Sequence, residues 1–99
     1  MLVHSVFFWL REDLSDAERA AFRKGVDTLT TIGSAEAVYV GTPAATAARP
    51  VVDTTYDIGL TVVAKDVPAH DVYQEDPIHL AFVNEFKGYW TKVTIYDVD

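Results

Sequence analysis

The chain has no cysteine among its 99 residues, which excludes disulfides, thiolate nucleophiles and cysteine-ligated zinc sites. Basic residues are few, with eight Lys and Arg against fifteen Asp and Glu, so the net charge is −7. Nucleic acids and anionic membranes are bound by basic surfaces, and the eight cations are scattered along the sequence. We therefore expect neither nucleic acid nor membrane as a partner.

A long hydrophobic run is also missing. The apolar stretch at the N-terminus covers residues 2–10, whereas a membrane-spanning helix needs about 20 apolar residues. The stretch has no basic leader and no small-residue cleavage site, so it is a poor signal peptide. We expect a cytoplasmic protein.

Material for a core is abundant. Hydrophobic residues make up 49% of the sequence and aromatic residues 12%, which argues against disorder. A chain of this length builds one core, because two would each be too small to be stable. Residues 1–99 are therefore expected to form a single domain.

The hydrophobic pattern predicts an alternation of strands and helices. A capping box of Ser15 and Glu18 opens an amphipathic helix that runs from Asp16 to about Ile32 and is stopped by Gly33. A short helix opens at residues 66–68 and carries Tyr73, and a second begins at Pro77 and ends at Phe86, before Gly88. The strands are expected at residues 2–10, 36–41, 54–64 and 90–98, with Tyr56, Ile58, Leu60 and Val62 on one face of the third. Residues 42–53 are expected to form a long loop.

The order β-α-β-β-α-β is that of the α+β, ferredoxin-like fold, which has a four-stranded antiparallel sheet with the first and third strands in the centre. Two helices cover one face of such a sheet. The first strand is nevertheless apolar on both faces, since Val3, Phe7 and Trp9 alternate with Leu2, Val6, Phe8 and Leu10. A second copy packed on the uncovered face removes this apolar surface from water. We therefore expect a homodimer.

The sequence around Pro77 brings two functional side chains together. Asp76 is suited to cap the helix that begins at Pro77, because proline fits the first helical position. His79 then lies in the first turn, six residues after Tyr73. The helix dipole disfavours imidazolium there, so a neutral His79 can act as a general base while the Tyr73 hydroxyl orients a substrate oxygen. The alternative is purely structural, with His79 packing on Val83 and Tyr73 in the core.

Several short segments resemble the stress-responsive dimeric α/β-barrel domain family. They are Leu-Val-His-Ser-Val-Phe-Phe at residues 2–8, Val-Tyr-Val-Gly at 38–41, Tyr-Asp at 56–57, Tyr-x-x-x-Pro-x-His at 73–79 and Tyr-Asp at 96–97. The Tyr…Pro-x-His element is the most specific of these. The resemblance extends over nearly the whole chain and implies two ferredoxin-like subunits packed sheet to sheet as a dimeric α/β barrel.

The resemblance also implies roles for individual residues. A plant polyketide (olivetolic acid) cyclase of this family uses a Tyr/His pair, to which Tyr73 and His79 correspond as catalytic residues. His4 corresponds to a pocket histidine on the first strand and Asp97 to an acidic residue on the last, both as ligand-binding residues. Two departures from the family pattern make the pocket less basic. Asp76 stands where the family often has a histidine, and the position of a further cyclase histidine on the third strand corresponds to about Ile58 in this chain.

The residues around His4 and His70 also indicate how these two side chains are placed. His4 lies next to Tyr96 and Asp97 if the first and last strands are antiparallel neighbours, and a carboxylate there can fix a histidine tautomer. His70, among several acids, indicates a solvated helix surface. No spacing resembles a metal motif such as His-Glu-x-x-His, so no metal and no cofactor are expected.

Three functions remain open on this reading. The first is a pocket lined by His4, Tyr73 and His79 that binds a small apolar or aromatic compound and performs cofactor-free acid/base chemistry of the cyclase or isomerase kind on a carbonyl or phenol. The second is a non-catalytic dimeric module, stress-related or accessory. The third is a cofactor-independent monooxygenase-like enzyme, suggested by architecture alone.

Overall fold

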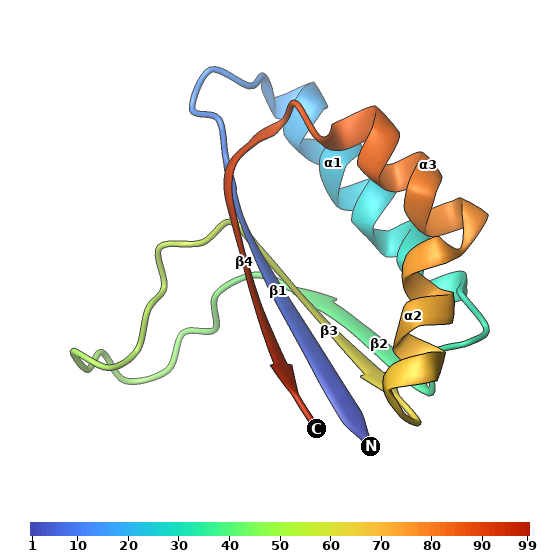
Figure 1. Cartoon of the computed structure of the whole chain (residues 1–99). Coiled ribbons are helices and arrows are strands. Elements are labelled where there is room, and N and C mark those ends of the chain that lie inside the picture. The colour runs from blue at the N-terminus through green and yellow to red at the C-terminus, as the bar shows by residue number, and fades with distance from the viewer.

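A computed structural model describes all 99 residues of the chain. A four-stranded antiparallel sheet in the order β2-β3-β1-β4 carries the helices on one face (Figure 1). The elements are β1 (Leu2–Leu10), α1 (Asp16–Thr28), the 3-10 turn η1 (Leu29–Thr31), β2 (Ala37–Gly41), β3 (Ile58–Ala64), α2 (Val67–Glu75), α3 (Pro77–Phe86) and β4 (Trp90–Val98). The predicted α+β, ferredoxin-like fold is confirmed, with β1 and β3 in the centre.

Local signals in the sequence set most helix boundaries. Ser15 accepts a hydrogen bond from the Glu18 backbone N–H, and the Glu18 carboxylate accepts one from the Ser15 N–H, which completes the capping box. The helical turns continue to Thr31, close to the predicted end, but the last turn is 3-10. The hydroxyls of Thr28, Thr30 and Thr31 each donate a hydrogen bond to the carbonyl three residues earlier. These bonds satisfy backbone carbonyls at the C-terminal end of the helix. Gly33 does not adopt a positive φ.

The third strand is shorter than predicted. It begins at Ile58, and residues 54–57 belong to the long loop that extends from the sheet on the side away from the helices (Figure 1). The Asp57 carboxylate accepts a hydrogen bond from the Leu10 N–H at 2.7 Å, so a side chain replaces regular pairing there. The predicted side of Tyr56 was wrong. Its ring lies 4.9 Å from that of Phe7, on the face opposite Ile58.

One face of the sheet and the helices enclose the core. Alternate residues of β1 and β3 point into it, and α1 and α3 contribute aromatic and aliphatic side chains from above. The largest fully buried side chains are those of Phe22, Val26, Leu29, Val62 and Tyr73. The other face of β1 carries Val3, Ser5, Phe7 and Trp9, which are only partly buried in this chain.

The closest approach of α1 to α3 depends on a glycine. A Cβ atom added to Gly25 would overlap the ring of Phe86, which is itself buried. We expect Gly25→Ala to lower the free energy of unfolding by about 1–3 kcal/mol, because overpacking outweighs the better helix propensity of alanine. Urea denaturation measures this change.

The matched control is Gly33→Ala, since a Cβ there meets nothing within 4 Å. Its free energy of unfolding should equal that of the wild type or exceed it. Equal stability of the Gly25→Ala and Gly33→Ala proteins would contradict the packing of α1 on α3 described here.

Candidate functional site

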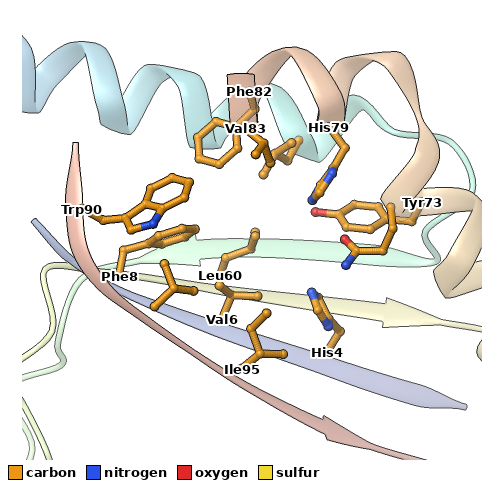
Figure 2. A pocket seen from close by; sticks show the side chains of 13 residues that line it. His4, Val6, Phe8, Leu60, Tyr73, His79, Phe82, Val83, Trp90 and Ile95 are labelled. Carbon is orange, nitrogen blue, oxygen red and sulfur yellow. The ribbon is translucent and has the colours of Figure 1, made fainter. Parts of the chain in front are cut away.

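A cavity of about 150 Å³ lies between the sheet and helices α2 and α3 (Figure 2). Thirteen residues line it, and ten of these are hydrophobic. The other three are His4 of β1, Gln74 of α2 and His79 of α3. Leu60 of the central strand β3 is 3% exposed, whereas Ile95 of the edge strand β4 is 48% exposed. The cavity is therefore closed toward the centre of the sheet and reaches solvent along β4.

The joint between α2 and α3 positions the phenol and the imidazole. Asp76 ends α2, where its N–H donates to the Tyr73 carbonyl, and begins α3, where its carboxylate accepts from the Ile78 N–H at 2.8 Å. Tyr73 and His79 consequently approach each other from two helices, with ring centroids 5.2 Å apart. Figure 2 shows the Tyr73 hydroxyl directed into the cavity near His79. Both residues line the cavity.

His4 forms the floor of the same end of the cavity and is 2% exposed. It is paired in register with Asp97 on β4, as the antiparallel arrangement predicted. Its Nδ1 lies 2.5 Å from Oδ1 of Asp97. A neutral His4 in this pair carries its proton on Nδ1, which leaves the lone pair on Nε2. Asp97 itself does not line the cavity and contacts it only through His4.

Buried polar atoms without a hydrogen-bond partner gather at this place. The chain has five of them, and three belong to cavity residues: the Tyr73 hydroxyl, Oε1 of Gln74 and Nδ1 of His79. A fourth is Nε2 of His70, whose ring lies 4.8 Å from that of His4. Buried polar atoms are nearly always paired in proteins, and an unpaired one costs about 1–3 kcal/mol. This end of the cavity therefore presents several polar atoms that no group of the chain pairs.

Burial keeps both predicted catalytic groups neutral. It raises the pKa of the Tyr73 hydroxyl far above its usual 10.0, and the negative charge of Asp76 raises it further. Burial also lowers the pKa of His79 below its usual 6.5, with a smaller contribution of the same sign from His4 and His70. The Gln74 backbone and the Asp76 carboxylate favour the protonated imidazole but do not outweigh burial. At neutral pH the site thus presents an uncharged base beside an uncharged phenol.

Two residues of this region were not predicted from the sequence. The interpretation of His70 as part of a solvated surface was wrong, because its side chain is only 15% exposed and packs on His4. Its spacing of three from Tyr73, which places the two on one helix face, was the available signal. Gln74 gave no such signal, since a glutamine next to Tyr73 and Glu75 is typical of an exposed helix.

The family of stress responsive A/B barrel domains matches residues 2–99. The chain belongs to this family. No curated protein matches it. The match confirms the resemblance found in the sequence.

None of the helices combines the length and hydrophobicity of a membrane span.

Solved structures with the same fold have low sequence identity to this A/B barrel domain. A family member with a ferredoxin-like fold from Mesorhizobium loti is 22% identical, with a TM-score of 0.77, and the match covers 99% of this chain and 94% of that one. A dimeric ferredoxin-like protein of unknown function from Thermobifida fusca is 14% identical, with a TM-score of 0.78 and coverages of 98% and 88%. The hydroxynitrile lyase of Passiflora edulis is 18% identical, with a TM-score of 0.76 and coverages of 98% and 90%.

The lowered pKa of His79 predicts how stability depends on pH. The unfolded chain binds a proton near pH 6.5 while the folded chain resists it, so the stabilising contribution is complete above that pH and decreases below it. The free energy of unfolding of the wild type should therefore fall between about pH 7.5 and about pH 5.5. In His79→Gln this fall should be smaller. Urea titrations at a series of pH values test this, and parallel profiles for the two proteins would contradict it.

Proposed function

We propose that the cavity binds a small carbonyl or phenolic compound and that His79 and Tyr73 perform acid/base chemistry on it without a cofactor. One observation carries the proposal: three unpaired buried polar groups, from Tyr73, Gln74 and His79, converge on an otherwise apolar cavity. The apolar part of such a ligand would contact the hydrophobic lining, and one or two polar groups on it would hydrogen-bond to the three unpaired groups.

The size of the cavity restricts the ligand. An engineered cavity of about 150 Å³ in another protein holds benzene, and the cavity here has about the same volume. A compound with a single aromatic ring, or an aliphatic one of equal bulk, is therefore the expected ligand. Larger compounds would need to extend past Ile95 into solvent.

Each polar group has a role in this proposal. His79, kept neutral by burial, takes a proton from the carbon next to the substrate carbonyl, and the electrons of that C–H bond form the enolate. The Tyr73 hydroxyl stays protonated and donates a hydrogen bond to the developing oxyanion. His4, oriented by Asp97, accepts a hydrogen bond from a second polar group through Nε2. Return of the proton from His79 to another carbon completes an isomerisation. Attack of the enolate on a second carbonyl of the same compound, followed by transfer of the His79 proton to the alkoxide so formed, completes a cyclisation.

A hydroxynitrile lyase of the same fold supports the suitability of this scaffold for a catalytic small-molecule site, although a shared fold does not carry a shared reaction. The alternative, a non-catalytic module in which His79 only ties helix to sheet, requires the imidazole to form internal hydrogen bonds. Apart from a contact with the Gln74 backbone, no group of the chain pairs with this imidazole, and its Nδ1 has no partner, which favours the catalytic proposal.

We also infer that two copies pair through the uncovered face of the sheet. Phe7, Trp9, Tyr56 and Tyr96 cluster there, and Phe7 lies within 6.5 Å of the rings of both Tyr56 and Tyr96. Tyr96 is 63% exposed in the single chain. Aromatic clusters of this kind typify the centres of interfaces. A protein of similar fold from Thermobifida fusca is dimeric, which supports the inference of a dimer.

The proposed chemistry predicts catalysed exchange of carbon-bound protons. In D2O the wild type should accelerate deuterium incorporation into the methyl group of acetophenone, which NMR detects directly. His79→Gln should lower this rate by about 100-fold or more, the usual contribution of a general base. Tyr73→Phe should lower it as well, because the oxyanion loses its donor.

Stability separates the proposal from the alternative. Neither variant should melt below the wild-type temperature, because neither the Tyr73 hydroxyl nor Nδ1 of His79 is paired within the chain. A structural His79 instead predicts a stability loss of about 1–3 kcal/mol and no exchange activity in any protein. Tyr39→Phe, at a residue that is 67% exposed, serves as the control and should retain the full rate.

If two copies pair through the uncovered face of the sheet, the protein is a dimer, and a charged residue introduced at the centre of that face should weaken it. Sedimentation at low micromolar concentration should give twice the chain mass for the wild type. Phe7→Glu should raise the dissociation constant by roughly 30-fold, since a central aromatic residue contributes about 2 kcal/mol. Leu80→Glu introduces the same charge at an exposed residue of α3 and should not alter the mass. A monomeric wild type, or equal effects of the two substitutions, would contradict the interface.

A further inference from the structure

We propose that His4, His70 and Asp97 form a binding site for a divalent transition-metal ion, with Zn²⁺ as the representative ion. These residues come from three elements, β1, α2 and β4, and are brought together only by folding. One ligand atom of each lies within 4.8 Å of those of the other two. The site shares His4 with the cavity but does not depend on the acid/base chemistry proposed above.

The two ring nitrogens of His70 have different surroundings, and this difference gives the strongest support for a metal site. Nδ1 lies 3.1 Å from Oδ1 of Asp71, so the carboxylate holds the ring proton on that nitrogen. The lone pair is then on Nε2, which is buried and has no partner. A carboxylate that orients an imidazole through one nitrogen and leaves the other free is the usual arrangement around a metal-binding histidine.

His4 and Asp97 supply the second nitrogen and the oxygen. Nδ1 of His4 and Oδ1 of Asp97 share one proton in the metal-free chain. Binding of the cation between them moves this proton to Nε2 of His4, so the imidazole stays neutral and the Nδ1 lone pair is free for the ion. The Asp97 side chain is 45% exposed, whereas that of His4 is 3% exposed. Asp97 therefore gives the ion a route from solvent to the two imidazoles.

The donor set selects the kind of ion. Two imidazole nitrogens and one carboxylate suit Zn²⁺, Co²⁺ or Fe²⁺, whereas Mg²⁺ and Ca²⁺ prefer all-oxygen sites. Ligand atoms around a tetrahedral Zn²⁺ are roughly 3.3 Å apart, given bonds of about 2.0–2.1 Å. To reach this spacing the His4–Asp97 pair must widen from 2.5 Å, and ligand atoms up to 4.8 Å apart must move closer together. Three protein ligands leave a fourth position for water or an oxygen of a bound compound.

The experiment is titration of the intact protein with Co²⁺ and Zn²⁺. Co²⁺ should produce visible absorption bands of a nitrogen- and oxygen-ligated ion, with one ion per chain, and Zn²⁺ should displace it. His70→Ala and Asp97→Asn should each weaken Zn²⁺ binding by more than about tenfold. Thermal melting without metal verifies that both variants are folded, and only folded variants enter the comparison. His4→Gln provides a second ligand variant.

Two controls distinguish this site from its surroundings. Glu75→Gln removes one negative charge from an exposed position of the same helix and should retain wild-type affinity. His79→Gln removes the third histidine of the region and should retain it too. The proposal is overturned if the wild type binds no Zn²⁺, if all folded ligand variants keep wild-type affinity, or if millimolar Mg²⁺ competes equally, as for ions held only by the acidic surface.

Discussion

The architecture depends on a first strand that is apolar on both faces. β1 pairs with β3 on one side and β4 on the other, so it lies in the centre of the sheet and its two rows of side chains face two different environments. The row of Val6, Phe8 and Leu10 is covered by the helices and forms the core. The row of Phe7 and Trp9 is left to the long loop and to the proposed second subunit. Burial of the first row excludes water from the core. The polar atoms at the end of this row therefore depend on partners other than bulk water for their hydrogen bonds.

His4 is the polar member of the buried row. It lies where the sheet meets α2, the four unpaired polar groups around it come from α2 and α3, and its carboxylate partner comes from β4. Two proposals arise from this region because it is rich in polar atoms and poor in internal partners. The cavity side, with Tyr73 and His79, suits an oxygen-bearing organic compound. The outer side, with His70 and Asp97, suits a cation.

The accuracy of sequence-based interpretation varied with the range of the interactions. The start of α1, the joint at Asp76 and Pro77 and the bounds of β4 were predicted well, because caps, proline and strand patterns act between near neighbours. The pairing of Tyr73 with His79 followed from the same joint. Tyr56 was misplaced because the Asp57 side chain, through a bond to a distant strand, interrupts the alternation on which strand prediction relies. His70 was misinterpreted because its local neighbours are acidic, whereas its actual neighbour is His4.

The sequence by itself determined the class of fold, the order of its elements and the meeting of an imidazole with a phenol at a helix joint. These follow from hydrophobic periodicity and capping, which are interactions between residues a few positions apart. Only the tertiary structure decided that Asp97 contacts His4, that His70 and Gln74 are partly buried beside them, and that a cavity remains between helices and sheet. Such features depend on register and on the volumes of side chains packed across the core, and no pattern of neighbouring residues encodes those quantities.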